Sequence, residues 1–237
     1  MDHNWLLAVG LFAALAIFAY LCGCFNGAVI VSKYIFKDDV RTHGSGNAGL
    51  TNFHRTFGGK WTAAVLAMDM VKTAVAVWVA ALVARGILAG TGTWSTALLS
   101  IYCPEQEAGN WWITFAKYWA GMFCVIGHMY PCMFGFKGGK GILSGGTLLL
   151  VIGDWRIILV GWGGFLLLAV LTRWVSLGSI WAGLSFPFST WFVYQDWLLT
   201  LMAAVVGGLI VWKHRGNLQR ILKGEERKFS LHHKEKA

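Results

Sequence analysis

The sequence predicts an all-α, polytopic membrane protein, and its composition supports this fold class in three ways. Hydrophobic residues fill 57% of the 237 positions and charged residues only 13%, about half the charged share of an average soluble domain. The 14 Trp suit the two membrane interfaces, and the 30 Gly allow close contacts between helices. We expect residues 1–237 to form one integral membrane domain, of which 213–237 is a basic cytoplasmic tail.

Hydropathy predicts seven transmembrane helices along this domain. The candidate spans are residues 5–31, 61–88, 111–126, 141–152, 157–171, 175–193 and 197–212. Several are shorter than the ~20 residues that a perpendicular helix needs to cross a bilayer. These segments therefore require tilt, a thin interface or partial insertion.

The distribution of Lys and Arg predicts the orientation. The loops after the first, third and fifth spans, together with the tail, carry 16 of the 20 basic residues. Positive charge is enriched on the cytoplasmic side of membrane proteins, so we expect the N-terminus outside and the C-terminus in the cytoplasm. No Lys or Arg precedes Lys33, so the basic region of a signal peptide is missing and the first span should be retained. The outer segment 91–110 is interpreted as a solvated connector.

The first glycine-rich stretch, residues 44–55, reads GSGNAGLTNFHR. Closely spaced glycines let backbone N–H groups line one concave surface that holds an anion. If the segment after Ala48 is helical, Thr51 and Arg55 share a face, and the guanidinium can grip phosphate oxygens. The alternative is that the glycines only turn the chain. The candidate substrate-binding residues here are Gly44, Gly46, Asn47, Gly49, Thr51 and Asn52.

One acidic and one basic side chain interrupt the second span. Asp69 and Lys72 stand three residues apart in an otherwise apolar run. Charges at that depth are costly unless they pair or face a cavity. We expect an ion pair that points into the bundle, with a direct catalytic part as the less favoured alternative.

The second glycine-rich stretch, residues 127–141, places Lys137 and Lys140 around a Gly-Gly pair that opens the next helix. Helix N-termini with free amides attract phosphate. The P-loop spacing is not met, because Gly141 stands where Ser or Thr is required, so nucleotide hydrolysis is disfavoured. His128 is typical of a hydrogen-bonded residue at a helix end, although a catalytic part stays open.

The third polar stretch, residues 213–226, follows the last span. Read alone, it is an amphipathic tail on anionic lipid headgroups. The predicted topology, however, puts all three polar stretches on one membrane face, which indicates a single active site. The five cysteines, at positions 22, 24, 103, 124 and 132, have no partners at metal-ligand spacing, so no metal and no disulfide frame are expected.

Together these stretches resemble the three motifs of the bacterial acyl-phosphate:glycerol-3-phosphate acyltransferases, the PlsY family. The resemblance rests on GSGNAGLTN-x-x-R (44–55), GHMYP…FKGGKG (127–141) and HR-x-N-x-x-R…G-x-E (214–226). It implies transfer of a fatty acyl group from acyl phosphate to the 1-hydroxyl of sn-glycerol 3-phosphate. The products would be lysophosphatidic acid and phosphate, in the first step of bacterial phospholipid synthesis.

The resemblance also implies location, partners and site residues. The active site would face the cytoplasm from the bacterial inner membrane, among membrane lipid, with no cofactor, coenzyme A, ATP or nucleic acid. The catalytic residues would be Ser45, Arg55, Lys140, His214, Asn217 and Glu226. Further substrate-binding residues would be Gly127, His128, Lys137, Gly138, Gly139 and Gly141.

The residues suggest a mechanism with two alternatives left open. Ser45 and Asn217 would hold a phosphate or the developing oxyanion, and the hydroxyl proton would leave to His214 or to the donor phosphate. Ser45 acting as a covalent nucleophile is the competing mechanism. The acyl tail is expected in a groove between helices that opens to lipid. A transporter is the main rival function, but we find no repeated halves in the sequence.

Overall fold

The computed structural model describes residues 4–90 and 108–229, and all regular structure in these ranges is helical, as predicted. The elements are α1 (Asn4–Cys24), α2 (Gly27–Tyr34), η1 (Val40–Thr42), α3 (Leu50–Phe57), α4 (Trp61–Gly90), α6 (Ala108–Met129), η2 (Cys132–Phe134), α7 (Ile142–Ile152), α8 (Trp155–Ile158), η3 (Leu159–Gly163), α9 (Gly164–Thr172), α10 (Val175–Tyr194), α11 (Trp197–Lys213) and α12 (Arg215–Leu222). The predicted outer segment 91–110 lies almost wholly outside the described residues, as does the tail beyond 229.

Each of the seven predicted apolar runs coincides with a helical segment of the described chain. By length and composition, Trp61–Gly86 and Trp155–Thr172 are long and apolar enough to cross a membrane, and up to four spans result if two bent helix pairs count as one span each. The count of seven spans and the orientation therefore stay predictions. The first run is not one straight helix, because α1 and α2 are bent by 43°.

Asn26 explains that bend. Its side chain accepts a hydrogen bond from Val29 N at 3.1 Å and so caps α2, while its Nδ2 donates to Ala48 O at 3.0 Å. Asn and Asp at the residue before a helix satisfy the amides that the helix itself leaves free. The bend turns α2 away from the bundle and brings the first glycine-rich stretch beneath it.

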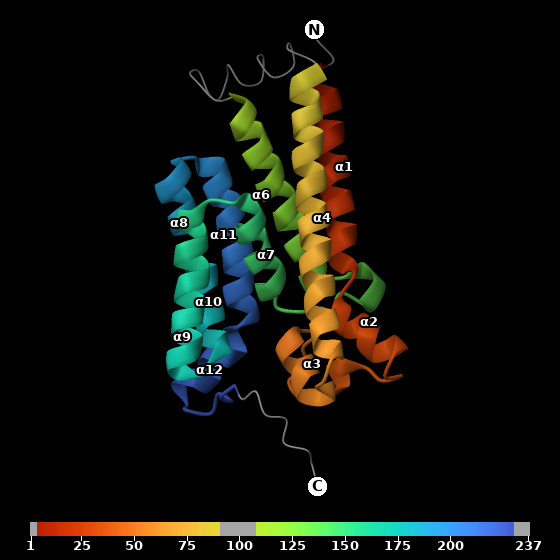
Figure 1. Cartoon of the computed structure of the whole chain (residues 1–237), viewed down its shortest axis with the longest axis vertical. Helices are drawn as coiled ribbons and strands as arrows, with labels where there is room; N and C mark the ends of the chain where they lie inside the picture. Colours follow the sequence, from red (N-terminus) through yellow and green to blue (C-terminus); the bar gives the residue numbers. More distant parts are fainter. Residues whose placement is uncertain (1–3, 91–107, 230–237) are drawn as a thin grey trace.

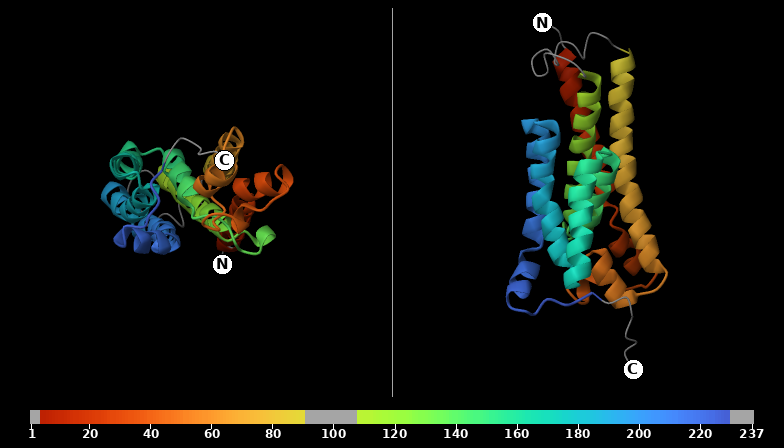
Figure 2. Two further views of the ribbon diagram at one scale, coloured as in Figure 1. Left: turned by 90° about the horizontal axis from the view of Figure 1, so that it is seen from below. Right: turned by 60° about the vertical axis from the view of Figure 1, so that its left-hand side comes forward.

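The long helices form two groups with α7 between them (Figures 1 and 2). α1 packs on α6 and α4, while α10 packs on α11 and α9. Gly23 and Gly127 let α1 and α6 approach closely, since a Cβ at Gly127 would lie 2.1 Å from Tyr20 O. Small residues at helix contacts permit this approach. Gly127 thus serves helix packing, and its contact with substrate stays a prediction.

The Asp69–Lys72 pair inside α4 is confirmed as a buried ion pair, with Lys72 Nζ 2.7 Å from Asp69 Oδ1. The same ammonium donates to Phe25 O and to His128 Nδ1, both at 2.9 Å. Its three N–H donors are therefore all used, and Asp69 also accepts from Gly27 N at 3.2 Å. The pair ties α4 to the α1–α2 bend and to the end of α6.

Candidate active site

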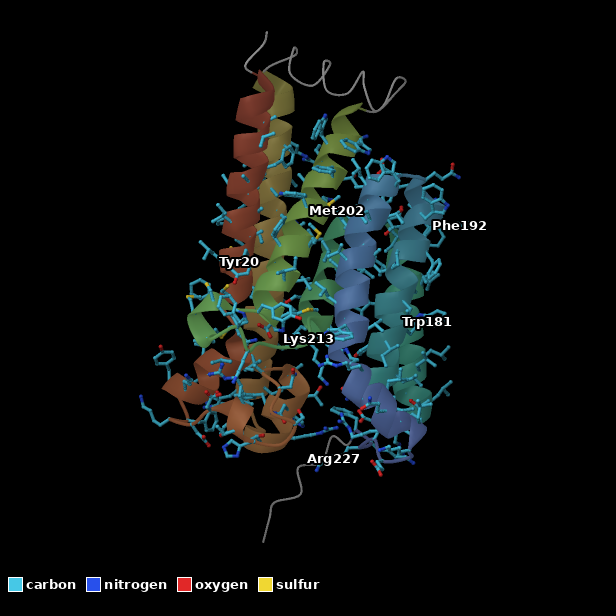
Figure 3. The ribbon with its side chains drawn as sticks, turned by 180° about the vertical axis from the view of Figure 1, so that it is seen from behind. Tyr20, Trp181, Phe192, Met202, Lys213 and Arg227 are labelled. Atoms are coloured by element: carbon cyan, nitrogen blue, oxygen red, sulfur yellow. The ribbon has the colours of Figure 1, made fainter. Side chains whose placement is uncertain are left out.

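The three polar stretches meet at one end of the bundle. α2, α3, the segment before α7 and α12 all lie at the lower end in Figure 1, and the two views of Figure 2 agree. Figure 3 places Lys213, at the end of α11, and Arg227 at this same end. The predicted clustering of the three stretches on one side of the molecule is therefore present in the fold.

A chain of hydrogen bonds joins the second and third stretches. Lys140 Nζ donates to Asn217 Oδ1, and Asn217 Nδ2 donates to Glu226 Oε1 at 2.7 Å. The ammonium keeps two further donors, and the amide keeps one. These donors are what the site can offer to a phosphate or to an oxyanion.

Glu226 forms the far end of this chain of hydrogen bonds and is itself held by further donors. It accepts from Ser176 Oγ at 2.7 Å and from Arg220 Nε at 2.8 Å, in addition to Asn217. Burial raises the pKa of the Glu226 carboxyl, but the three hydrogen bonds outweigh burial and leave the pKa below its usual value. These contacts fit a residue that orients Asn217 more than one that handles substrate. Sequence reasoning missed Ser176, because no spacing links it to a residue 50 positions away.

Positive charge exceeds negative charge around Lys140. Burial, followed by nearby Arg220, Arg55 and Lys213, lowers the pKa of Lys140 to about 8, although Glu226 opposes this. The pKa of Arg55 is also lowered, by burial and then mainly by Arg227. Clustered cations with one carboxylate are unfavourable in the empty site and favour an anionic ligand.

His214 is a buried, neutral imidazole. Its Nδ1 lies 2.8 Å from Ile210 O, and a carbonyl can only accept, so Nδ1 carries the hydrogen and Nε2 is left as an acceptor. Burial and, next, the charge of Lys140 lower the pKa of His214 to about 4. Near neutral pH this residue accepts a hydrogen bond and is a weak proton acceptor.

Asn52 shapes the first glycine-rich loop. Its buried amide donates to Val40 O at 3.0 Å and to His43 O at 3.1 Å, and its Oδ1 accepts from Ser45 N at 3.0 Å. Gly44 has a φ of +58°, and a Cβ there would lie 2.3 Å from Asn52 Oδ1. These contacts show that Asn52 and Gly44 shape the loop, and their contact with substrate stays a prediction.

The same loop leaves its other candidates near the surface. Ser45 and Gly46 are exposed, whereas Asn47, Gly49 and Thr51 are partly buried. The first stretch does become helical, as α3, which buries Phe53 and leaves Arg55 only partly covered. The electrostatic influence of Arg55 on Lys140 joins the first stretch to the other two.

The second glycine-rich loop uses its amides differently from the prediction. Gly138 N donates to Met129 O at 3.2 Å and Gly139 N to His128 O at 3.1 Å, so both cap the end of α6 and neither is free for phosphate. A Cβ at Gly139 would lie 2.1 Å from His128 Nε2. Gly141 has a φ of +78° and begins α7. These glycines shape the backbone around Lys140, and His128 is buried at the helix end with its Nδ1 bonded to Lys72; their contact with substrate stays a prediction.

Arg41 clamps the first loop to the second and was missed by sequence reasoning. Its Nη1 donates to Phe134 O at 2.7 Å and to Lys137 O at 3.2 Å, while Nε and Nη2 pair with Asp39. Hydrogen bonding to Arg41 lowers the pKa of Asp39 to about 2, so the pair stays charged. The backbone of Lys137 is held by this clamp, and its side chain is exposed. The only signal in the sequence was an Asp-x-Arg triplet before the glycines.

Comparison of the sequence with known proteins identifies the family of this chain. A family model described as glycerol-3-phosphate acyltransferase matches residues 13–224. The glycerol-3-phosphate acyltransferase of Thermoanaerobacter pseudethanolicus is 34% identical over 214 residues, which cover 90% of this chain and 93% of that protein. The glycerol-3-phosphate acyltransferase of Yersinia pestis is 33% identical over 212 residues, which cover 90% and 84%.

Solved structures agree with the relatives. The fold resembles the crystal structure of PlsY, an integral membrane glycerol 3-phosphate acyltransferase, in its glycerol 3-phosphate form, with a TM-score of 0.71, 30% identity and coverage of 92% of this chain and 96% of that one. The lysophosphatidic acid form of PlsY gives a TM-score of 0.67 at 29% identity, with coverage of 93% and 96%.

Fold and site together define a multi-pass membrane protein of the acyltransferase class. The chain belongs to the glycerol-3-phosphate acyltransferase family, which includes PlsY.

Proposed function

We propose that this chain transfers a fatty acyl group from acyl phosphate to the 1-hydroxyl of sn-glycerol 3-phosphate, giving lysophosphatidic acid and phosphate. One observation carries the proposal: Lys140 hydrogen-bonds Asn217 and lies within the electrostatic influence of Arg55, Arg220 and Lys213. Acyl phosphate and glycerol 3-phosphate are both anions, and the reaction must bring them together. A concentrated positive charge in a partly buried site supplies the compensation that this approach requires.

In the proposed reaction, the 1-hydroxyl oxygen attacks the acyl carbonyl carbon. The new C–O bond forms, the bond between the carbonyl carbon and the phosphate oxygen breaks, and phosphate leaves with that electron pair. Lys140 and Arg55 would stabilise the charge on the phosphates, and the free N–H of Asn217 would face the developing oxyanion. Glu226 would keep the Asn217 amide in the required orientation through its 2.7 Å hydrogen bond.

The proton of the attacking hydroxyl goes to the donor phosphate in this proposal. His214, with a pKa of about 4, is a weaker base than a phosphate dianion, whose second pKa is about 6. Its Nε2 would accept a hydrogen bond that orients the hydroxyl. Covalent catalysis by Ser45 finds less support, because no imidazole or carboxylate of the described residues hydrogen-bonds its hydroxyl.

An apolar crevice of about 20 Å³ marks where the acyl tail would enter, and its walls would have to separate to admit the tail. It begins near the charged site at Ile142 and Ile210, and Nδ1 of His214 donates to the carbonyl of this Ile210. The crevice is also lined by Gly145, Gly146, Leu149, Gly161, Trp162, Phe165, Ala182, Phe186 and Val206. These residues come from α7, η3, α9, α10 and α11. A tail here would leave its acyl phosphate group beside Lys140.

The active site is proposed to face the cytoplasm from the bacterial inner membrane, on the charge asymmetry of the loops. The test is phosphate release by purified protein supplied with acyl phosphate and labelled glycerol 3-phosphate, with acyl coenzyme A as the alternative donor. We expect release that depends on glycerol 3-phosphate, and loss of at least 100-fold in Lys140→Met. Lys60→Met, which changes an exposed lysine at the same end, is the matched control.

Three outcomes would overturn the proposal. They are turnover with acyl coenzyme A but not with acyl phosphate, uptake of glycerol 3-phosphate into vesicles without product, and equal activity of Lys140→Met and Lys60→Met. A stable acyl adduct on Ser45 after incubation with donor alone would replace the direct transfer with a covalent mechanism.

A further inference from the structure

A second concave surface lies away from the charged site, between α10 and α11. It is a groove of about 380 Å³, within the usual range for ligand sites. Its walls are Gly183, Leu184, Pro187 and Phe188 of α10, Ala204, Gly207, Gly208, Val211 and Trp212 of α11, and Arg215 and Leu218 of α12. We call it the α10–α11 groove.

The groove forms because α10 and α11 contact each other through their backbones, at Gly183 and Gly207, along its floor. Pro187 has no N–H, so the carbonyl of Gly183 four residues earlier loses its helical donor. A Cβ at Gly207 would lie 2.1 Å from this Gly183 O, so only glycine allows the contact. Side chains on either side, such as Leu184 and Phe188, then stand out as walls and are 51% and 75% exposed.

The length of the groove fits one leaflet of a bilayer. Along α11 it extends from Ala204 to Trp212, which at 1.5 Å per residue is roughly 12 Å, and it continues past the 52° bend to Arg215 and Leu218 of α12. Half of a ~30 Å hydrocarbon core is roughly 15 Å. A groove of this length accommodates an acyl chain that enters from one membrane face.

The end of the groove near α12 is cationic and aromatic. The Arg215 guanidinium lies 4.4 Å from the Trp212 ring centroid, and its Nη1 donates to Trp212 O at 3.0 Å. No carboxylate of the described residues lies within ion-pair distance of Arg215. Four of its five N–H donors stay available, in a planar fork that suits phosphate oxygens. Tryptophan and arginine at this position are typical of headgroup depth.

We propose that the α10–α11 groove binds an anionic diacyl phospholipid of the surrounding bilayer, with one acyl chain along the groove and the headgroup phosphate on Arg215. A second copy of this chain fits less well, because copies that share one membrane orientation bring like-charged ends together. The groove meets the third polar stretch only at Arg215 and Leu218 and is lined by neither Lys140 nor Asn217, so lipid retention can be measured apart from acyl transfer.

The test is native mass spectrometry of the detergent-purified full chain after exchange into phosphatidylglycerol, phosphatidylcholine or inorganic phosphate. We expect one retained phosphatidylglycerol, with at least fivefold less phosphatidylcholine and no retained phosphate. Gly208→Leu should reduce the retained phosphatidylglycerol at least fivefold, because a Cβ at Gly208 meets nothing within 4 Å and the leucine fills the groove without disturbing the helix contact. Arg215→Gln should remove the preference for the anionic lipid.

Each variant has a matched control. Gly86→Leu also adds a side chain where a Cβ meets nothing within 4 Å, and Lys60→Gln changes a lysine 5.9 Å from the Trp61 ring, outside the groove. Both should retain phosphatidylglycerol as the parent chain does. Equal retention by Gly208→Leu, equal retention of the two lipids by the parent chain, or a dimer in place of bound lipid would each refute the proposal.

Discussion

The perturbed pKa of Lys140 makes a quantitative prediction about substrate affinity. Burial and the neighbouring cations lower this pKa from 10.5 to about 8. At about 1.4 kcal/mol per pKa unit, the charged ammonium is disfavoured by about 3 kcal/mol in the empty site. A bound phosphate dianion offsets the neighbouring cations and raises the pKa of Lys140 again. Binding therefore selects the protonated ammonium.

The sign of the pH dependence follows from this linkage. Affinity for glycerol 3-phosphate is fully present below pH 8, where Lys140 is already protonated in the free protein. Above pH 8 the free ammonium deprotonates, so KM should rise by up to tenfold per pH unit until the pKa of the complex is reached. The phosphate itself titrates near pH 6 and contributes nothing in this window.

The assay is KM for glycerol 3-phosphate between pH 7 and 10 in the parent chain and in Lys140→Arg. Arginine stays charged throughout this range, so its KM should be flat above pH 8, whatever its absolute value. The comparison of slopes separates the titration of Lys140 from any loss of fit. A flat KM in the parent chain, or the same slope in Lys140→Arg, would refute the argument from clustered charge.

Three further predictions concern the residues that hold the site. Glu226→Gln removes the charge that raises the pKa of Lys140, so the rise in KM should begin below pH 8. An unchanged onset would contradict the electrostatic effect of Glu226 on Lys140. Asn52→Ala removes three hydrogen bonds of the first loop and should lower the unfolding free energy by about 2–4 kcal/mol, as measured by denaturation in detergent; a loss below about 1 kcal/mol would argue against its role. Asp69→Ala leaves Lys72 buried without its partner and should cost about 3–5 kcal/mol, which Asp69→Ala combined with Lys72→Met should largely restore.

Sequence reasoning reached those features that depend on local pattern. The helices follow from apolar runs, and the Asp69–Lys72 pair follows from a three-residue spacing within one helix, so both needed no knowledge of the tertiary fold. The clustering of Arg55, Lys140 and Asn217 was predicted from the alternation of loop charge, because adjacent loops of a membrane bundle alternate between its two faces. The clustering of the polar stretches at one end of the bundle could thus be predicted from residue type and loop charge, while the membrane side stays a prediction.

The missed features all depend on contacts between distant parts of the chain. Ser176 reaches Glu226 only because the segment after α12 returns to the start of α10, where Trp174 Nε1 also donates to Glu226 O at 3.2 Å. Arg41 reaches the carbonyl of Phe134 across 93 residues. No spacing encodes such pairs, since each one joins two segments that are far apart in the chain and meet within one helix group. The glycines of the second loop are a different case, because Gly138 and Gly139 donate their amides to Met129 O and His128 O at the nearby end of α6.

The bonding of the Gly138 and Gly139 amides to the end of α6 affects how the site would recognise phosphate under the proposed function. A glycine loop that offers free amides binds an anion through fixed backbone dipoles, whose strength does not depend on pH. Here Gly138 and Gly139 donate their amides to carbonyls at the end of α6, so under the proposed function phosphate recognition would rely on side-chain cations, among them Lys140 with a pKa of about 8. The loop instead fixes the backbone from which Lys140 projects. The glycines and the lysine are thus adjacent in sequence for different reasons. A glycine at position 139 allows the backbone to pack against the His128 ring, and the lysine carries the charge.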